Sequence, residues 1–167
     1  AHMITFSQAF ADALYQKMKE DQKIHVISAA MINGSSLQRI FNDFKNRSHD
    51  VGIAEEHAVC FANGLALSQL KPVVSLYSTF MQRAYDEINH DIARINSSVV
   101  FLVDRAGIVG EDGETHQGIY DISFLYPLKN VTILMPPNTS YVQACLDFAF
   151  LHGGPVFIRY SKSTVYK

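Results

Sequence analysis

Six short apolar runs alternate with segments of helical periodicity, and this alternation constrains the fold more than any other feature of the chain. The runs are rich in Val, Ile, Leu and Phe and cover residues 24–27, 51–53, 73–76, 99–103, 131–135 and 156–159. Strands that are apolar throughout are buried on both faces, and helices that connect successive strands make them parallel. We therefore predict an α/β fold of three layers, with a mostly parallel six-stranded sheet covered by helices on both faces.

Helical periodicity fills the segments between these runs. The first helix is expected to begin at Thr5 or Ser7, with Gln8 completing a weak capping box after Thr5, and to end near Asp21. Further helices are expected over about residues 37–44, 56–70, 78–95 and 140–151. The polar residues 46–49 would then connect the second helix to the next strand.

Length and charge exclude several classes of protein. A chain of 167 residues suits one domain that buries a substantial core without disulfides or metals. The 14 Lys and Arg residues nearly balance the 16 Asp and Glu residues, so nucleic acid is not an expected partner. No apolar run approaches the roughly 20 residues that cross a bilayer, and no signal-peptide pattern opens the chain. We expect a soluble, cytoplasmic protein without membrane contact.

Two cysteines and a glycine lie inside helical patterns. Cys60 and Cys145 occupy apolar segments and are predicted to be buried free thiols. Gly64 lowers the stability of its helix, so a tight packing contact is expected there. Residues 1–3 match the remnant of an expression tag followed by a start methionine. Residues 4–167 are then expected to form a single domain cut from a longer protein.

The stretch from Asp50 to Val59 is the most chemically dense part of the chain. It turns an apolar segment directly into a helix that begins with two carboxylates and a histidine. Glu55 would lie at the carboxyl edge of the sheet, where open α/β folds bind ligands. A carboxylate there is also favoured by the unpaired amides of the helix start. The residue types alone leave a functional role and simple helix stabilisation equally open.

Three more strands end in polar or charged side chains. These side chains are Tyr77, Arg83, Asp104, Arg105, Arg159 and Lys162. The Gly-rich segment 106–118 adds Asp112 and His116, and loops of this length inside a compact domain are usually functional or disordered. Together they would form a pocket for a small anionic substrate, because guanidinium groups bind phosphate and carboxylate oxygens.

Several of these residues also have a plainer interpretation. Arg83 and Arg105 could be surface charges paired with Asp86 or Asp104, and such pairs contribute little stability. Phe80 could belong to the core or to a pocket wall, since aromatic rings serve both. The choice between these readings depends on whether the strand ends converge.

Familiar cofactor motifs are missing from the sequence. Glu55, Glu56 and His57 are consecutive and do not share a helix face, and no paired cysteine motif occurs, so no metal ligand is predicted. Neither a glycine-rich nucleotide-binding motif nor a GxSxG elbow is present. His25, inside a strand, is expected to be structural, and His152 is expected at a helix end.

Three long motifs carry a family resemblance. They are DVGIAEEHAV at residues 50–59, KPVVSLYSTFMQRAYDEINHDIA at 71–93 and DRAGIVGEDGETHQGIYDISFL at 104–125. The run from Asp50 to Asn138 resembles the 1-deoxy-D-xylulose-5-phosphate synthase family, thiamine diphosphate enzymes of the transketolase superfamily. That family condenses pyruvate with glyceraldehyde 3-phosphate and releases CO₂, which supplies precursors for isoprenoids, thiamine and pyridoxal.

The resemblance implies that this chain is only the middle, pyrimidine-binding domain of such an enzyme. The domain that binds Mg²⁺ and the cofactor's diphosphate is missing from the sequence, so the chain alone is expected to be inactive. Expected partners are that diphosphate-binding domain, pyruvate and glyceraldehyde 3-phosphate, with a homodimer in the full-length protein. Two alternatives stay open: a transketolase or 2-oxo acid dehydrogenase β-type domain, and a non-catalytic dimerisation or assembly module.

The resemblance also implies roles for the residues at the strand ends. Glu55 would be catalytic by hydrogen-bonding the pyrimidine ring of the cofactor, and Phe80 would stack on that ring. His116 would be a second catalytic residue that exchanges protons or hydrogen-bonds with the reaction intermediate. Arg105 would bind the substrate phosphate. The residues implied to contact substrate are Tyr77, Arg83, Arg105, Asp112, His116 and Lys162.

Two positions depart from the family pattern. Glu56 stands where the family usually has glutamine, which adds a carboxylate beside Glu55. Lys162 occupies the place of a phosphate-binding arginine, so a point charge remains but the bidentate fork is lost. The second departure predicts a changed substrate affinity rather than a different reaction.

Overall fold

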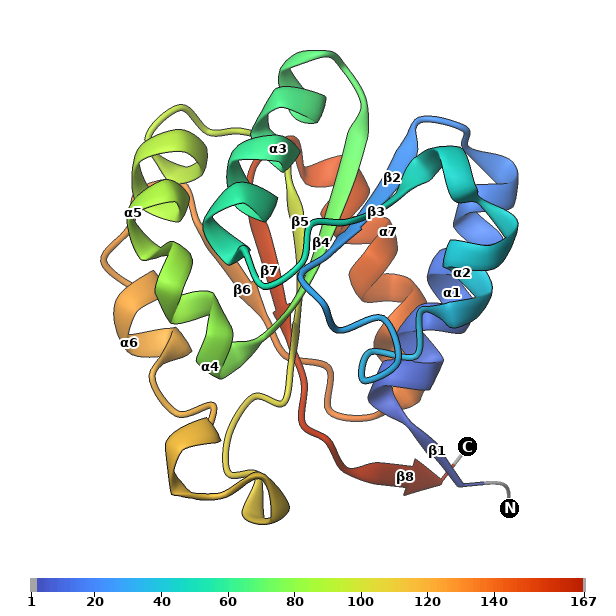
Figure 1. The fold of residues 1–167 in the computed structure, drawn as a ribbon, viewed down its shortest axis with the longest axis vertical. Helices are drawn as coiled ribbons and strands as arrows, with labels where there is room; N and C mark the ends of the chain where they lie inside the picture. The colour runs from blue at the N-terminus through green and yellow to red at the C-terminus, as the bar shows by residue number, and fades with distance from the viewer. Residues whose placement is uncertain (1–2, 167) are drawn as a thin grey trace.

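The main sheet has six parallel strands in the order β3-β2-β4-β5-β7-β6. A computed structural model describes residues 3–166 of the chain, and side chains from residue 3 to residue 164. The strands are β2 (Ile24–Ser28), β3 (Ser48–Asp50), β4 (Lys71–Tyr77), β5 (Val100–Asp104), β6 (Thr132–Leu134) and β7 (Val156–Arg159). Every neighbouring pair in this sheet is parallel, which confirms the predicted arrangement (Figure 1).

Helices cover both faces of the sheet (Figure 1). One face carries α1 (Phe6–Glu20), α2 (Gln38–Asp43) and α7 (Val142–His152). The other carries α3 (Glu55–Leu67), α4 (Ser78–Met81), η2 (Gln82–Ala84), α5 (Tyr85–Glu87), η3 (Ile88–Ala93) and α6 (Asp121–Leu125). Four short 3₁₀ turns lie in the connections: η1 (Lys45–Arg47), η4 (Gly110–Asp112), η5 (Glu114–His116) and η6 (Thr139–Tyr141). The three layers of the predicted α/β fold are confirmed.

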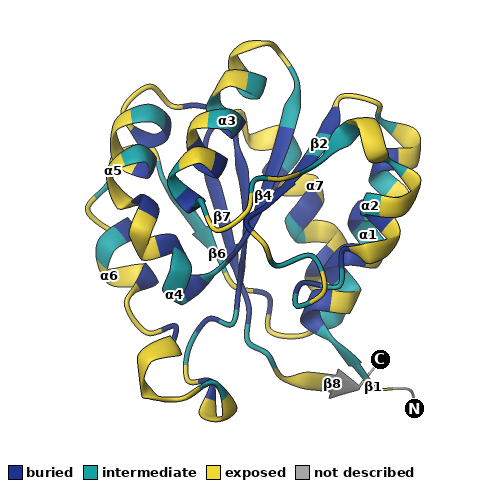
Figure 2. Ribbon diagram, viewed as in Figure 1, coloured by how far each residue is buried: buried dark blue, intermediate teal, exposed yellow. Residues whose placement is uncertain are grey.

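Each face of the sheet supports its own hydrophobic cluster. Consecutive strand residues point to opposite faces, so Val73 packs with α1 and α7 while Val74 packs with α3. β5 and β7 are buried along their whole length and β4 in all but its first and last residues, whereas most exposed residues lie on the outer sides of the helices and in the loops (Figure 2). A sheet buried on both faces explains why its strands read as continuous apolar runs.

The strand predicted at residues 51–53 is wrong by three residues. β3 is Ser48–Asp50, and Gly52 adopts a left-handed φ of 73°, which ends the strand and which glycine adopts without steric cost. The Asp50 carboxylate accepts N–H bonds from Gly52 at 3.0 Å and Ala30 at 2.9 Å, fixing this turn. β3 pairs only with β2, and an edge strand tolerates the polar residues that its sequence contains.

The helix predicted over residues 78–95 is instead a chain of short segments with changing winding. A tighter 3₁₀ turn at η2 and a wider π turn at η3 interrupt the α-helical pattern. Met81, Ala84, Ile88 and Ile92 are all fully buried, so the changes in winding keep one apolar side against the sheet. The helix α1, in contrast, has the predicted cap, because the Thr5 hydroxyl oxygen accepts the Gln8 N–H at 3.1 Å.

Three elements, two strands and one helix, have no counterpart in the sequence-based assignment. β1 (Met3–Thr5) pairs antiparallel with β8 (Thr164–Tyr166), so Met3 takes part in strand pairing, and residues 1–2 lie outside the described part of the chain. The helix α6 follows the Gly-rich loop. Within residues 3–166 no helix is both long and apolar enough to cross a membrane.

Two predictions about helix interiors are wrong. Cys60 is exposed on the outer side of α3 and Cys145 is half-buried, although both thiols are free as expected. Gly64 is also exposed, and a side chain there would meet nothing within 4 Å. Apolar content had suggested burial, but the buried residues of α3 lie on one side of the helix, and Cys60 and Gly64 are not among them.

Candidate active site

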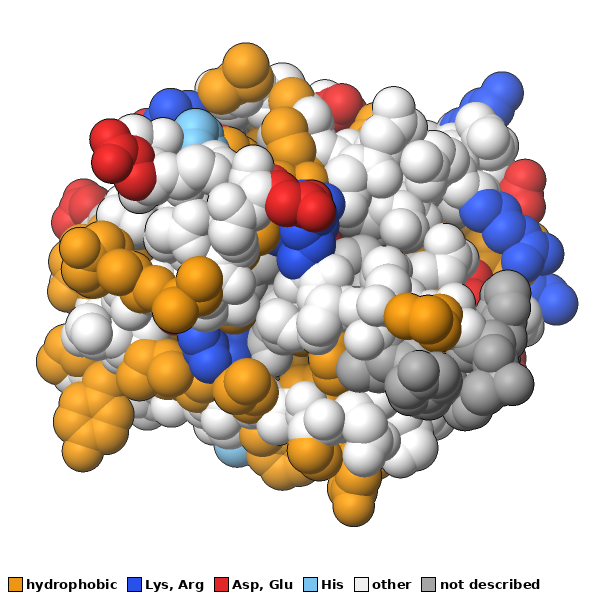
Figure 3. Space-filling model, turned by 90° about the horizontal axis from the view of Figure 1, so that it is seen from below, with side chains coloured by type: hydrophobic (Ala, Val, Ile, Leu, Met, Phe, Trp, Pro, Cys, Tyr) orange, Lys and Arg blue, Asp and Glu red, His pale blue; other side chains and the backbone are white. Residues whose placement is uncertain are grey.

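The carboxyl ends of the strands and the loops that follow them lie at the lower end of the molecule in Figure 1. The Gly-rich segment closes on itself there, because Gly107 and Gly118 exchange N–H···O bonds of 2.7 and 2.9 Å. Viewed from this end, acidic and basic side chains stand side by side near the centre of the face, with hydrophobic side chains around them (Figure 3). This is the edge at which the sequence placed its candidate residues.

A pocket of about 290 Å³ gathers most of these candidates. Its lining residues are Met31, Tyr77, Phe80, Arg105, Asp112 and His116. All but the first were predicted from the sequence. Met31 was missed because the candidates were sought among charged, polar and aromatic residues, and it is none of these. An apolar side chain in a loop at the carboxyl edge of a strand was the available signal for it.

Three aromatic rings and one guanidinium group form the body of the pocket. Tyr77 and Phe80 stack with ring centroids 5.5 Å apart, and the His116 ring meets Phe80 edge-on at 5.5 Å. The guanidinium carbon of Arg105 lies 4.1 Å from the centroid of the Tyr77 ring, which is a cation–π contact. The pocket therefore combines flat apolar surfaces with a fixed positive charge.

Arg105 is held from behind by Asp104, the last residue of β5. The Asp104 side chain is completely buried, and its Oδ1 accepts the Arg105 backbone N–H at 2.8 Å and lies 3.0 Å from Arg105 Nη1. Its Oδ2 accepts a hydrogen bond of 2.7 Å from the Ser7 hydroxyl on α1. Burial raises the pKa of Asp104, and the Arg105 charge partly opposes that shift. The backbone φ of Arg105 is +54°, a strained value that this anchoring maintains.

The guanidinium group of Arg105 is not fully satisfied by its protein partners. Nη1 is buried and, despite its ion pair with Asp104, makes no aligned hydrogen bond. A buried donor without an aligned acceptor is costly, so an anion that reached this guanidinium group would be favoured. The remaining charge contact is loose, since Arg105 Nε lies 3.9 Å from Asp112 Oδ2.

Lys162 contacts the pocket only through Asp112. Its ammonium group donates to Asp112 Oδ1 at 3.0 Å and to Glu111 Oε2 at 3.2 Å, and these hydrogen bonds raise the pKa of Lys162. The side chain lines a neighbouring groove of about 470 Å³ between the Gly-rich loop and residues 161–164. The structure thus places this predicted substrate ligand beside the pocket, paired with two carboxylates.

Glu55 and Arg83 form a separate pair. Glu55 is 2% exposed and is the first residue of α3, and its Oε2 accepts a hydrogen bond of 2.8 Å from Arg83 Nη1. The Arg83 side chain is half exposed at 50%. The helix start and this guanidinium compensate the charge of a buried carboxylate. Neither residue lines the pocket around Tyr77, and the pairing of Arg83 with Glu55 rather than Asp86 was not foreseen.

Other charged candidates make structural contacts. Arg159 binds the buried Asp121 carboxylate through Nε at 2.8 Å and Nη2 at 3.3 Å, which ties α6 to β7. His25 stacks with His49, and His152 ends α7 beside Thr132, as expected for structural histidines. Across the described residues, no three or more potential ligands gather into a metal site.

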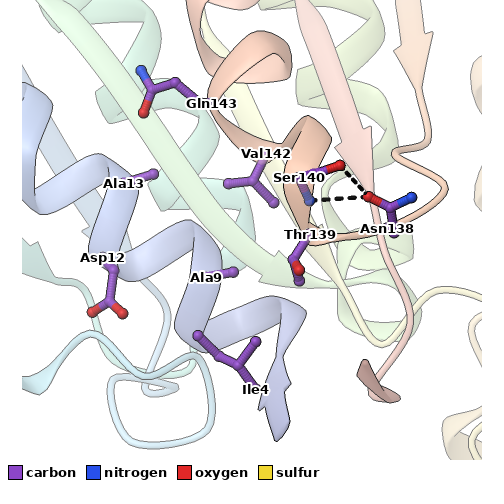
Figure 4. Close-up of a pocket in the computed structure, with 9 residues that line it drawn as sticks. All are labelled: Ile4, Ala9, Asp12, Ala13, Asn138, Thr139, Ser140, Val142 and Gln143. Atoms are coloured by element: carbon purple, nitrogen blue, oxygen red, sulfur yellow. Dashed lines mark hydrogen bonds between the residues drawn. The ribbon is translucent and has the colours of Figure 1, made fainter. Parts of the chain in front are cut away.

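A larger cavity lies elsewhere and lacks this chemistry. It measures about 540 Å³ and runs between α1 and the start of α7 (Figure 4). Ala9, Ala13 and Val142 give it an apolar floor, and Asp12 is its one ionisable lining residue. Size alone would select this groove, but the convergence of charged and aromatic side chains selects the smaller pocket.

Comparisons with known proteins show the family of the chain. Residues 2–167 match the family model described as "Transketolase, pyrimidine binding domain". The 1-deoxy-D-xylulose-5-phosphate synthase of Clostridium tetani is 48% identical over 159 residues, which cover 95% of this chain and 26% of that protein. The synthase of Campylobacter jejuni is 44% identical over 158 residues, with the same coverage of 95% and 26%. The chain spans about a quarter of the length of the curated relatives it matches.

Solved structures share the fold. One described as "Split gene transketolase, inactive beta4 tetramer" superposes with a TM-score of 0.87 at 27% identity, covering 99% of this chain and 54% of that one. The transketolase from Leishmania mexicana has a TM-score of 0.88 at 20% identity, with coverage of 99% and 26%. The family resemblance read from the motifs is confirmed. The chain belongs to the transketolase pyrimidine-binding domain family, and thus to the thiamine diphosphate-dependent enzymes.

Proposed function

We propose that this chain is the pyrimidine-binding domain of a longer synthase that condenses pyruvate with glyceraldehyde 3-phosphate to 1-deoxy-D-xylulose 5-phosphate, with loss of CO₂. The observation that carries the proposal is the pocket in which Tyr77, Phe80, Arg105, Asp112 and His116 converge. The names of the curated relatives support the choice of this reaction over that of a transketolase. Thiamine diphosphate supplies a stabilised carbanion when bound, so the chain itself has to bind, orient and exchange protons.

Glu55 is proposed to hydrogen-bond the pyrimidine ring of the cofactor. The fit rests on two features: Glu55 is 2% exposed, and its side chain lies at the start of α3 with the Arg83 guanidinium group 2.8 Å from its Oε2. A buried hydrogen-bonding carboxyl group next to the ligand edge of the sheet suits a heterocycle that has to be held in one tautomer. Phe80, with its ring stacked on Tyr77, offers the flat surface on which a pyrimidine would pack.

Arg105 and His116 are proposed to act on the substrate. Arg105 lines the pocket and its buried Nη1 lacks an aligned acceptor, so a phosphate oxygen that reached its guanidinium group would be favoured. The exposed His116 ring is fixed by its edge contact with Phe80 and by a 2.8 Å hydrogen bond to the Thr115 hydroxyl, so it can exchange a proton from a defined position. Tyr77 and Asp112 complete the substrate-binding wall.

Arg83 and Lys162 are proposed as further substrate ligands that must exchange partners. Each already binds carboxylates, Arg83 that of Glu55 and Lys162 those of Asp112 and Glu111. A substrate anion would therefore compete with an existing ion pair, which predicts a smaller contribution to affinity than that of Arg105.

The rest of the enzyme belongs to the same proposal. A diphosphate-binding domain that holds Mg²⁺ would complete the cofactor site, and the chain alone would then be inactive. We also propose a homodimeric full-length enzyme in the cytoplasm, where phosphorylated trioses are found.

Replacing Glu55 tests the proposal. In the full-length enzyme, Glu55→Ala is expected to lower the rate of condensation at least about 100-fold, the scale of a lost proton-transfer partner. Product formation from pyruvate and glyceraldehyde 3-phosphate is measured beside transfer between ketose phosphates. Glu56→Ala is the matched control, because Glu56 is adjacent and only half-buried. Near-normal turnover by Glu55→Ala, or a preference for ketose phosphates, would contradict the proposal.

A further inference from the structure

Gly34, in the loop between β2 and α2, touches the hydroxyl end of Tyr77. A Cβ atom at Gly34 would lie 1.9 Å from Tyr77 Oη and 3.0 Å from Cζ. Real Cβ atoms do not approach other atoms so closely, so any side chain at residue 34 would displace the tyrosine ring or the loop. Glycine is required here for close approach rather than for an unusual backbone conformation.

The loop around Gly34 is held in place on both sides. The Met31 N–H donates to the Ser28 hydroxyl at 3.1 Å, and the Ser35 N–H donates to the Met31 carbonyl at 3.0 Å. Leu37, at the end of the loop, is 1% exposed and its N–H donates to the Ile32 carbonyl at 2.9 Å. A clash at residue 34 would therefore move the Tyr77 ring rather than the loop.

Movement of the Tyr77 ring would also shift the Arg105 guanidinium group. The Arg105 guanidinium rests on this ring at 4.1 Å, and Phe80 stacks on the ring at 5.5 Å. Asp104 fixes the backbone N–H and one nitrogen of Arg105, which leaves the ring of Tyr77 to set the tilt of the guanidinium plane.

We propose that Gly34 is a positioning residue: it fixes the position of the Tyr77 ring and, through that ring, the orientation of the Arg105 guanidinium group toward the pocket. The consequence for phosphate binding rests on the proposed function, whereas the coupling of Gly34 to Arg105 does not. The loop after β2 thereby becomes part of the pocket, with Met31 as its lining residue.

The test follows the Nε–H signal of Arg105 by NMR in the 167-residue chain, assigned with Arg105→Lys. Gly34→Ala is expected to shift this signal in phosphate-free buffer and to weaken binding of inorganic phosphate at least about fivefold, within the range of coupling between residues in contact. Gly64→Ala is the matched control, because its new Cβ meets nothing within 4 Å. It should leave both readouts unchanged.

Tyr77→Phe provides the rescue, because it removes the Oη atom that lies 1.9 Å from the new Cβ and leaves only Cζ at 3.0 Å. The double variant Gly34→Ala, Tyr77→Phe should bind inorganic phosphate within about twofold of Tyr77→Phe alone, since the clash that couples residues 34 and 77 is then removed. This comparison decides the matter even if Gly34→Ala does not fold. The inference is overturned if a folded Gly34→Ala variant shows an unshifted Arg105 signal. It is also overturned if the double variant binds phosphate more than about twofold more weakly than Tyr77→Phe alone. Lack of phosphate binding by the wild-type chain would count against the proposed role of Arg105, and the phosphate-free signal would still decide the role of Gly34.

Discussion

Removing the Asp104 side chain should destabilise the fold more than any other single truncation at the pocket. Three groups depend on this completely buried carboxylate: the Ser7 hydroxyl at 2.7 Å, the Arg105 backbone N–H at 2.8 Å and Arg105 Nη1 at 3.0 Å. Asp104→Ala would leave the Ser7 hydroxyl and the Arg105 N–H without their acceptor and would remove the opposite charge beside Arg105 Nη1. The Arg105 side chain, only 13% exposed, could not easily reach water.

The magnitude follows from these contacts. Removal of one partner from a buried ion pair costs about 3 to 5 kcal/mol, because the other charge stays buried. Loss of the single hydrogen bond in Ser7→Ala should cost less, about 1.5 to 3 kcal/mol for a bond to a charged group, since the carboxylate keeps its other partners. The free energy of unfolding should therefore fall in the order wild type, Ser7→Ala, Asp104→Ala.

Urea unfolding followed by circular dichroism measures these free energies, with equal m-values as the check that both variants unfold in the same way. Asp104→Asn serves as the control for shape, because it keeps one acceptor oxygen of nearly the same geometry. An Asp104→Ala variant that lies within about 1 kcal/mol of the wild type would refute the reasoning, since that is below the penalty for leaving even one buried donor unsatisfied.

Two further predictions concern titration and thiol reactivity. Burial is the main cause that lowers the pKa values of His25 and His49 in the folded chain. In the unfolded chain these histidines take up protons at a pKa of about 6.5, so the unfolded state binds more protons than the folded state once the pH falls to that value. The free energy of unfolding should therefore fall as the pH drops through about 6.5. Thermal unfolding between pH 7 and pH 5 should show this loss, and a His25→Gln, His49→Gln double variant with an equal loss would contradict it. Partial burial of the sulfur and the hydrogen bond to Asp91 raise the pKa of Cys60 to about 11. Although the residue is exposed, its thiol should therefore react slowly with iodoacetamide at pH 8. Asp91→Asn should speed alkylation, and an unchanged rate would show that Asp91 does not hold the proton.

Most of the sheet and the pocket could be predicted from the sequence because both follow from local patterns. Apolar runs without alternation identify buried parallel strands, and the first polar residue after each run falls at the carboxyl edge. Tyr77 and Arg105 were found in this way, and Asp112 and His116 were found from the glycines around them. The structure brings these residues together as that rule requires.

Features that depend on contacts between distant segments could not be predicted. Glu55 was predicted at the carboxyl edge of the sheet without a named protein partner, and its carboxylate pairs with Arg83, 28 residues away in the chain. Cys60 reads as an apolar helix position, but which side of α3 faces the sheet depends on the packing of the whole layer. The register of β3 was set by a turn that the Asp50 carboxylate closes with Ala30 of another loop.

Gly34 and Gly64 show which features the sequence determines and which only the tertiary structure decides. By itself the sequence determined the α/β architecture, the family and the edge of the sheet at which the chemistry lies, because periodicity and motifs are properties of consecutive residues. It pointed to Gly64 as the site of a tight contact, and the structure shows open space there and a close approach at Gly34 instead. Only the tertiary structure could decide this, because the space beside a glycine is defined by a side chain more than 40 residues away, Tyr77 at the end of β4.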